Sequence, residues 1–251
     1  MESSVRQWYE LAARVANDAA AFLRSYRHTA EDVLMEEGKD IKIAADKKAE
    51  EIIVARLMQE SPFGILSEEA GEMVGASNEY QWIVDPLDGS LNFSRGIPLV
   101  AVSIGLWKGD EPVLGVIADV FGNQLYGGIV GEGAWVNGAP AVVSRVMQPE
   151  KGVIITGFPS HGDFSQDALL PFVQEIQRFK KVRLIGSATL SIAYVAAGFC
   201  DVYKERGIHL WDIAAGAAIA IAAGGAVVRM DEIAAHRYDV IVTNGVIHLS
   251  S

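Results

Sequence analysis

The sequence predicts a layered α/β protein in which helices alternate with sheets. Three observations indicate this class. The chain opens with a helical pattern of apolar residues, short apolar segments separated by glycine turns fill residues 64–143, and strand and helix patterns alternate after residue 151. With 251 residues, half of them apolar, the chain can form one large domain or two closely joined ones.

The first part of the chain predicts two helices. Residues 5–27 carry apolar side chains at helical spacing, which is typical of an amphipathic helix. The acidic stretch 31–40 is expected to be a loop. A second helix is expected over residues 44–59, and it ends before Ser61 because a residue that precedes proline disfavours the helical conformation.

Short strands are expected between residues 64 and 143. One begins at residue 64 and ends at acidic residues, and another covers residues 82–84. Four consecutive antiparallel strands follow, at 98–107, 112–120, 124–130 and 134–136.

The second part of the chain predicts alternating strands and helices. Strands are expected at 153–156, 182–184, 201–203 and 226–230, and helices at 164–179, 189–197 and from residue 211 to about 224. A boundary near residues 145–150 divides the chain into halves 1–147 and 148–251. No linker rich in serine or proline separates them, so we expect the halves to share an interface.

Composition excludes several classes of protein. A net charge of −11 and a pI of about 4.9 argue against a nucleic-acid-binding surface. The uncharged run 213–228 is shorter than the roughly 20 residues that a membrane-spanning helix needs. Cys200 is the only cysteine, so no intrachain disulfide can form, and the polar N-terminus does not resemble a signal peptide. We therefore expect a cytoplasmic protein.

The segment WIVDPLDGSLNF, residues 82–93, is the most informative. An apolar run ends at Asp85, and Asp88 follows three residues later in a turn with proline and glycine. Two carboxylates that converge in a buried place need a cation, and hard oxygen ligands favour Mg²⁺, Mn²⁺ or Ca²⁺. The alternative is an ordinary turn, because Asp-Pro and Asp-Gly pairs are common in turns.

Two further segments carry acids at comparable places. In GILSEE, residues 64–69, Glu68 follows a short strand, and in GIHLWDIAAG, residues 207–216, Asp212 lies at the start of an alanine-rich helix. Glutamate pairs are often solvated, and Asp212 alone could be a helix cap. Bound cations would reconcile the acidic chain with an anionic substrate.

Taken together, these segments resemble the inositol monophosphatase family, a branch of the Mg²⁺-dependent, lithium-sensitive sugar phosphatases. The resemblance extends from about residue 40 to residue 225. Its ordered blocks are residues 45–50, 67–69, 85–93, 186–188 and 207–212. It implies the helix–sheet layers of the sugar phosphatases, an active site between the two halves, and a homodimer.

The resemblance also implies two or three Mg²⁺ ions, which Mn²⁺ can replace. Glu68, Asp85 and the Leu87 carbonyl would bind the first ion. Asp85 would bridge to a second, which Asp88 and Asp212 complete, and a weaker third ion would lie near Glu68. Glu68 is thus expected to be catalytic as well as a ligand.

A hydroxyl paired with an aspartate activates the attacking water in this family. The matching pair is Ser90 with Asp46, although most members have threonine in place of Ser90, and Ile43 stands where the family usually has threonine. Gly89, Ser90 and Leu91 are expected to begin a helical turn whose N–H groups bind phosphate oxygens.

The substrate pocket is inferred from the same resemblance. Its expected lining is Gly186, Ser187, Ala188, Glu205 and Arg206. Glu205 would accept hydrogen bonds from ring hydroxyls. Lys204 and Arg206, which flank it, either lie in solvent, the interpretation we favour, or turn inward and bind a second phosphate, as in fructose bisphosphatase.

The predicted function is Mg²⁺-dependent hydrolysis of inositol monophosphate, a small phosphate ester, with no nucleic-acid or membrane partner. A dual inositol monophosphatase and fructose bisphosphatase is the nearest alternative, followed by a phosphatase for phosphoadenosine phosphate or NADP. A non-catalytic metal-binding protein with the same fold is the alternative from another class. Comparing rates on inositol monophosphate and fructose bisphosphate would separate the first two hypotheses. Absence of a metal ligand or of the Ser90 hydroxyl would favour the non-catalytic protein.

Overall fold

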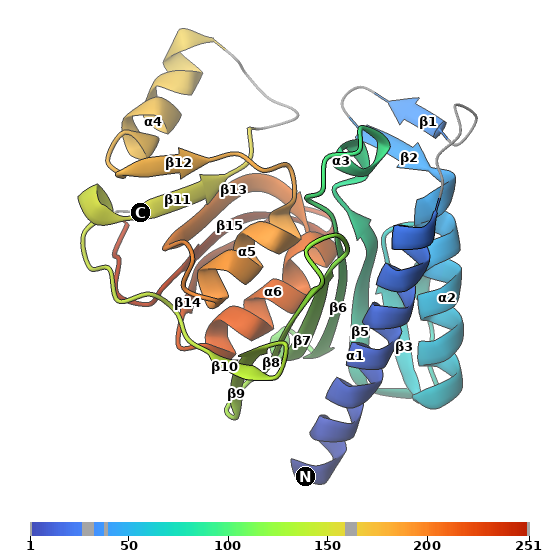
Figure 1. The fold of residues 1–251 in the computed structure, drawn as a ribbon. Helices are drawn as coiled ribbons and strands as arrows, with labels where there is room; N and C mark the ends of the chain where they lie inside the picture. The colour runs from blue at the N-terminus through green and yellow to red at the C-terminus, as the bar shows by residue number, and fades with distance from the viewer. Residues whose placement is uncertain (1, 27–32, 38–39, 159–164, 250–251) are drawn as a thin grey trace.

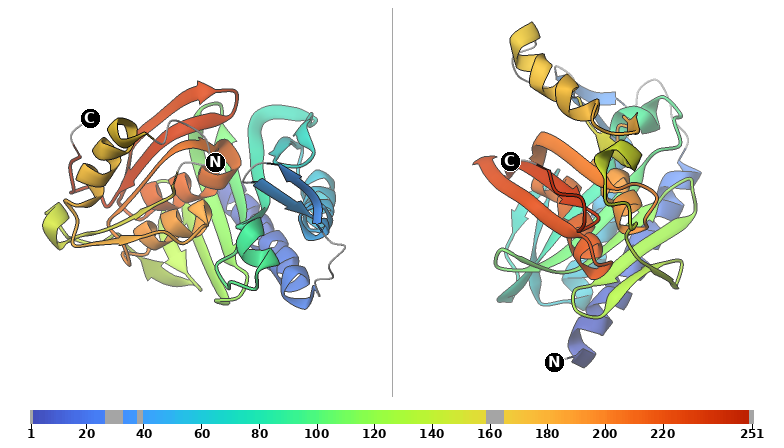
Figure 2. Two further views of the ribbon diagram at one scale, coloured as in Figure 1. Left: turned by 90° about the horizontal axis from the view of Figure 1, so that it is seen from above. Right: turned by 90° about the vertical axis from the view of Figure 1, so that its left-hand side faces the viewer.

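The computed structural model describes residues 2–26, 33–37, 40–158 and 165–249, and they form alternating layers of helix and sheet (Figure 1). Helices α1 (Glu2–Ser25) and α2 (Ala44–Glu60) cover one face of an eight-stranded sheet. Helices α5 (Ala188–Ala196) and α6 (Leu210–Ala222) lie between that sheet and a five-stranded sheet, as the views of Figure 2 also show. The predicted layered α/β class is confirmed.

The eight-stranded sheet has the order β10-β9-β8-β7-β6-β5-β3-β4. Only β3 and β5 run parallel to each other, and the other pairs are antiparallel. The strands are β3 (Phe63–Ser67), β4 (Gly71–Met73), β5 (Ser77–Asp88), β6 (Ala101–Lys108), β7 (Glu111–Asp119), β8 (Gln124–Ile129), β9 (Gly133–Val136) and β10 (Ala139–Ala141).

The five-stranded sheet has the order β12-β11-β13-β15-β14. Strand β11 pairs in parallel with β12 and β13, and β15 is antiparallel to β13 and β14. The strands are β11 (Val153–Thr156), β12 (Lys181–Arg183), β13 (Val202–His209), β14 (Ala226–Ala234) and β15 (Arg237–Thr243). A 3₁₀ turn, η1 (Pro149–Lys151), precedes β11, and α4 (Gln166–Ile176) projects near β12 (Figure 1). The division of the chain after residue 147 stays a prediction.

The expected amphipathic pattern explains how the outer helices pack. In α1 the residues that face the sheet are almost fully buried: Leu11, Ala12, Val15, Ala16, Ala19, Ala20 and Leu23. The small alanines allow the helix to approach the strands closely. Helix α2 ends at Glu60, where Ser61 takes an extended conformation ahead of Pro62, as predicted.

Helix α6 is alanine-rich because it is enclosed between two sheets. Gly115 of β7 lies against its backbone, and a Cβ atom at this glycine would be 2.1 Å from the Ala215 carbonyl oxygen. The helix ends at Ala222, before Gly224 and Gly225, as predicted. Within the described ranges, no helix is long and apolar enough to cross a membrane.

The predicted loop over residues 31–40 is wrong where it can be checked. β1 (Val33–Glu37) and β2 (Asp40–Ile43) form an antiparallel hairpin beside the short helix α3 (Ser90–Ser94) (Figure 1). Backbone pairing across the hairpin outweighs the acidic composition on which the loop prediction depended. Residues 31, 32, 38 and 39 lie outside the described residues, as do residue 27 of the first predicted helix and residue 164 of another.

Other differences concern strand length. β5 extends past the predicted 82–84 to Asp88, because β6 continues to pair with it across an irregularity between Asp85 and Asp88. β13 extends past 201–203 to His209, because β15 pairs along it. Strands β4, β10 and β15 were not predicted. Such lengths depend on partner strands that are distant in sequence.

Candidate active site

Three aspartates from distant parts of the chain meet at one place. Asp85 and Asp88 come from the end of β5, and Asp212 comes from the first turn of α6. Each offers a carboxylate oxygen such that the three oxygens lie within 4.8 Å of one another. Three of the five residues that the sequence suggested as ligands are therefore brought together.

Glu68 lies at the neighbouring strand end. Because β3 and β5 are parallel and Ser67 pairs with Val84, their carboxyl ends reach the same edge of the sheet, and the Glu68 N–H donates to the Val84 carbonyl. Glu68 is half-buried and lies outside the close triad, but its charge acts on Asp85.

Burial and mutual repulsion dominate the electrostatics of this cluster. Burial raises the pKa of Asp85 well above its ordinary value, and the charges of Glu68, Asp212 and Asp88 raise it further. Burial, followed by the charge of Asp88, raises the pKa of Asp212 to about 8. Without a counterion, the cluster therefore opposes full ionisation.

A divalent cation fits this donor set. All of the ligating atoms are oxygens, which Mg²⁺ and Mn²⁺ prefer, and a cation would offset the repulsion that raises the pKa values. The Leu87 carbonyl oxygen, the predicted backbone ligand, lies 3.0 Å from the Ser90 hydroxyl oxygen, and a carbonyl oxygen has two lone pairs.

The predicted pair of Ser90 and Asp46 is in contact. The Ser90 hydroxyl lies 3.0 Å from Asp46 Oδ1, and the Ile43 N–H donates to Asp46 Oδ2 at 2.7 Å. Asp46 is buried in the first turn of α2, and Ser90 begins α3. Thus a backbone donor holds the aspartate where it meets the hydroxyl.

Gly89 permits the turn between β5 and α3. Its φ of +90° is a left-handed conformation that other residues rarely adopt. The first N–H groups of a helix have no partner inside the helix, so those at Ser90 and Leu91 suit an anion. The Leu91 side chain is exposed and apolar, so only the backbone N–H of this residue can bind a phosphate oxygen.

Glu50, which the sequence marked only as part of a motif, supports the segment that follows β3. Its buried carboxylate accepts hydrogen bonds from the Ser67 hydroxyl and from the N–H groups of Glu69, at 3.2 Å, and Ala70, at 3.0 Å. Because these donors flank Glu68, Glu50 fixes the backbone that carries this acid.

The start of α5 meets the aspartate cluster. Asp88 Oδ2 accepts hydrogen bonds from the Ser187 hydroxyl and from the Thr189 N–H, the latter at 2.8 Å. Burial raises the pKa of Asp88, and these donors, with the Ala188 N–H, oppose the rise. The segment 186–188, predicted as substrate lining, therefore also supports a candidate metal ligand.

Glu205 lies near this cluster on β13. The Tyr203 hydroxyl donates to Glu205 Oε2 at 2.9 Å, and Tyr203 itself is fully buried. Burial raises the pKa of Glu205 to about 7, and the charge of Asp88 adds to the rise, although Tyr203 and the Gly157 backbone favour the charged form. Glu205 can therefore change its charge near neutral pH.

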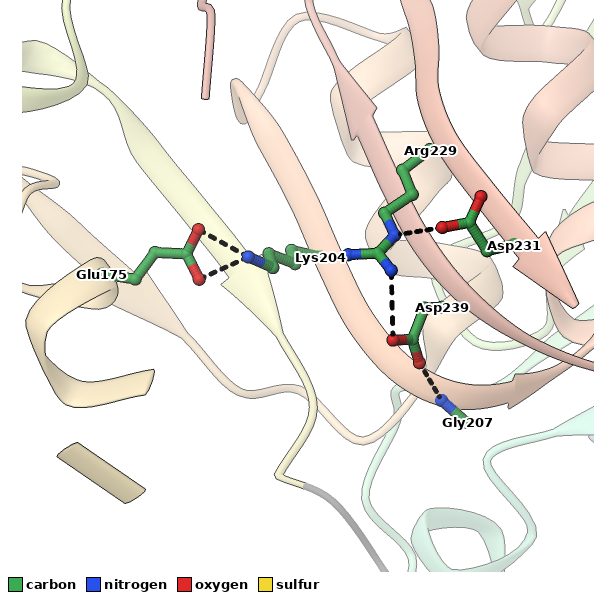
Figure 3. A network of polar contacts seen from close by, with 6 residues as sticks. All are labelled: Glu175, Lys204, Gly207, Arg229, Asp231 and Asp239. Atoms are coloured by element: carbon green, nitrogen blue, oxygen red, sulfur yellow. Dashed lines mark hydrogen bonds and ion pairs between the residues drawn. The ribbon is translucent and has the colours of Figure 1, made fainter. Parts of the chain in front are cut away.

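The two cations that flank Glu205 have different surroundings. Lys204 Nζ lies 2.6 Å from both carboxylate oxygens of Glu175 in α4, and Figure 3 shows this ion pair. Lys204 is thus neither solvated nor free to bind a phosphate in this arrangement, while Arg206 is exposed. The same figure shows that Asp239 accepts a hydrogen bond from the Gly207 N–H and also forms an ion pair with Arg229.

Sequence reasoning missed two residues of this site and gave no role to a third. Tyr203 supports Glu205, and Thr189 contacts two of the aspartates. Asn92 stands in the motif of residues 82–93, and its amide nitrogen lies within 3.2 Å of the carbonyl oxygens of Leu99, Ile185 and Gly186. The only signal for Thr189 was a hydroxyl at a predicted helix start, and nothing marked Tyr203.

Comparison with known proteins gives a consistent result. Residues 4–251 match the inositol monophosphatase family. An inositol-1-monophosphatase of Mesorhizobium japonicum is 42% identical over 193 residues, which cover 74% of this chain and 71% of that protein.

Solved structures share the fold over nearly the whole chain. The extragenic suppressor protein SuhB of Bartonella henselae superposes with a TM-score of 0.86 at 34% identity, covering 94% of this chain and 93% of that one. An inositol monophosphatase–fructose 1,6-bisphosphatase superposes with a TM-score of 0.76 at 25% identity, covering 94% of each chain.

Proposed function

The chain belongs to the inositol monophosphatase family of phosphatases, and from this premise we propose that it hydrolyses inositol monophosphate with the help of Mg²⁺. The observation that carries the proposal is the convergence of carboxylate oxygens of Asp85, Asp88 and Asp212 within 4.8 Å, where the first two residues are buried and Asp212 is half-buried. Such a cluster is costly without cations, and phosphate esters are the substrates that bound cations would attract.

The chain's residues divide the work of ester hydrolysis. Glu68, Asp85, the Leu87 carbonyl, Asp88 and Asp212 would hold two or three Mg²⁺ ions, or Mn²⁺ in their place. When bound, these ions would lower the pKa of a water and stabilise charge on the phosphoryl group and on the leaving oxygen.

Ser90 and Asp46 would take the proton from the attacking water. The hydroxyl lies 3.0 Å from Asp46 Oδ1, so a proton that reaches Ser90 can pass to a buried carboxylate. The N–H groups of Gly89, Ser90 and Leu91 would hold the phosphate oxygens at the start of α3.

Glu205 supports a polyol as the leaving group. Its carboxylate is oriented by Tyr203 and lies close enough to Asp88 for their charges to interact. Glu205 is half-buried, and an acceptor withdrawn from solvent in this way disfavours substrates that lack the matching hydroxyl, because it would be left unpaired. With the segment 186–188, Glu205 would select the sugar ring, while exposed Arg206 would contact only a large or doubly charged substrate.

Fructose bisphosphate is the second candidate substrate, because a structural neighbour combines both activities. The ion pair of Lys204 with Glu175 removes one cation that could bind a second phosphate. Inositol monophosphate is therefore preferred here. Phosphoadenosine phosphate, NADP and a non-catalytic role remain less favoured.

Comparing rates of phosphate release from the two sugar phosphates tests the substrate. We expect the wild type to have the higher kcat/KM for inositol monophosphate, and we expect Glu205→Gln to lower that value while changing the fructose bisphosphate rate less. Arg206→Gln, at an exposed neighbour, is the matched control for the inositol monophosphate rate, because Arg206 would contact only a large or doubly charged substrate. A wild type that prefers fructose bisphosphate would replace the substrate assignment. Dimer formation and lithium inhibition are predictions from the family, and a cytoplasmic location is a prediction from the composition of the chain.

A further inference from the structure

Thr189 contacts two candidate metal ligands at once. It is fully buried near the start of α5. Its N–H donates to Asp88 Oδ2 at 2.8 Å, and its hydroxyl donates to the Asp212 carbonyl oxygen at 2.9 Å.

Helix α5 also packs closely against α6. One turn beyond Thr189, Ile192 lies against Gly216, where a Cβ atom would be 2.7 Å from the isoleucine side chain. The two helices therefore touch at two successive turns, first through the hydrogen bond and then through close packing. This arrangement fixes where the first turn of α6 lies relative to α5.

Asp212 is held from two sides. The His209 N–H donates to Asp212 Oδ2 at 3.0 Å, and Thr189 binds its carbonyl. Asp88 uses Oδ2 for the start of α5, which leaves Oδ1 for other partners. The two aspartates repel each other when both are charged, so they need such anchors to stay close.

We propose that Thr189 is a positioning residue for the second cation site, because it sets the separation of Asp88 and Asp212 without binding the ion itself. This inference rests on the proposed metal-dependent function. Groups that orient metal ligands typically contribute about 10- to 100-fold in metal affinity or activity.

The test measures binding of Mn²⁺ to the whole chain directly. Binding is monitored by the electron paramagnetic resonance signal of Mn²⁺ and by calorimetry. Thr189→Val keeps the size and the backbone N–H but removes the hydroxyl. We expect it to weaken binding at one site by about 10- to 100-fold. Thr189→Ser restores the hydroxyl and should bind within a few-fold of the wild type.

Ser191→Ala is the matched control. It removes a buried hydroxyl from the same helix whose partner is the Ser187 carbonyl, at 2.6 Å, and not a ligand. We expect wild-type Mn²⁺ binding from it even if its melting temperature falls. Thr189→Ala provides a second measure should Thr189→Val unfold at the assay temperature.

The outcomes distinguish a failure of the role proposed for Thr189 from a failure of the proposed metal-dependent function. If Thr189→Val and Thr189→Ala bind Mn²⁺ as the wild type does, the role of Thr189 is overturned while the metal site stands. If Ser191→Ala weakens binding equally, the effect belongs to the helix and the inference also fails. If the wild type binds no Mn²⁺, the metal-dependent function fails, and the inference fails with it.

Discussion

The Ser90 hydroxyl lies 3.0 Å from Asp46 Oδ1, although the two residues are 44 positions apart in the chain. The contact joins the start of α3 to the first turn of α2 and lies next to the Leu87 carbonyl. A buried aspartate fixed by the Ile43 N–H thus supports a hydroxyl at the edge of the acidic cluster. This relationship carries the proposed path for the proton of the attacking water.

Ser90→Ala should remove that path. We expect kcat for inositol monophosphate to fall by about 10²- to 10⁴-fold, the usual contribution of general acid–base catalysis. Ser90→Thr keeps the hydroxyl and should retain activity within a few-fold. Steady-state phosphate release checks both. Full activity in Ser90→Ala would show that Asp46 and Ser90 have only a structural role.

Divalent cations should stabilise the folded protein. A ligand at 100 times its Kd adds about 2.7 kcal/mol to the free energy of unfolding, and each kcal/mol raises Tm by about 2–4 °C in a chain of this size. Thermal unfolding with Mg²⁺ or Mn²⁺, against EDTA, measures the shift. Asp85→Asn should lose it, because the Asp85 carboxylate would hold both ions. An equal shift in Asp85→Asn would place the ions elsewhere.

Glu205 should make stability fall as pH rises. Its pKa is raised from 4.5 to about 7 mainly by burial, so between these values the folded state binds more protons than the unfolded state. Its contribution is therefore complete below about pH 4.5 and is lost as pH rises through 7. One pKa unit corresponds to about 1.4 kcal/mol, so a rise from 4.5 to about 7 contributes at most about 3.5 kcal/mol.

Urea unfolding in EDTA at pH 5 and pH 8 checks this effect. Glu205→Gln cannot titrate, so we expect it to lose less stability than the wild type between the two values. The other groups that face Glu205, namely Tyr203, Asp88 and Asp212, are the same in both proteins. A parallel loss in both proteins would contradict the assignment of the shift to Glu205.

Gly115→Ala should destabilise the interface between β7 and α6. The added methyl would lie 2.1 Å from the Ala215 carbonyl oxygen, which is backbone and cannot move alone. Overpacking of this kind typically costs about 1–3 kcal/mol. Thermal unfolding measures it, with Gly109→Asn as the control at a left-handed turn that has open space around it. Equal stability of both variants would contradict the close packing.

The sequence was sufficient for the parts of the fold that depend on local pattern. Apolar spacing predicted α1, proline predicted the end of α2, and glycine predicted the end of α6. It failed for the hairpin of β1 and β2 and for the far half of β13. Those elements exist because backbone groups pair with partners, and an isolated segment carries little record of its partner.

The same distinction applies to the site. Asp85, Asp88 and Asp212 stand in motifs, and the structure brings them together. Thr189 acts through a contact with Asp212 on another helix, and Tyr203 acts through a contact with Glu205, two positions along the same strand. Neither residue stands in a motif that suggests chemistry. Lys204 stands next to a predicted site residue, but it forms an ion pair with Glu175, which lies on a helix 29 positions away in the chain. Only the folded chain reveals these pairings.

Phosphate release from inositol monophosphate, with Mg²⁺ and with EDTA, tests the central claim most directly when the wild type is compared with Asp88→Asn. The substitution keeps the shape of a side chain that Ser187 and Thr189 hold, and it removes one charge from the cluster. The account predicts release that requires Mg²⁺ and is lost in Asp88→Asn. Release that persists in EDTA, or that Asp88→Asn retains in full, would contradict it.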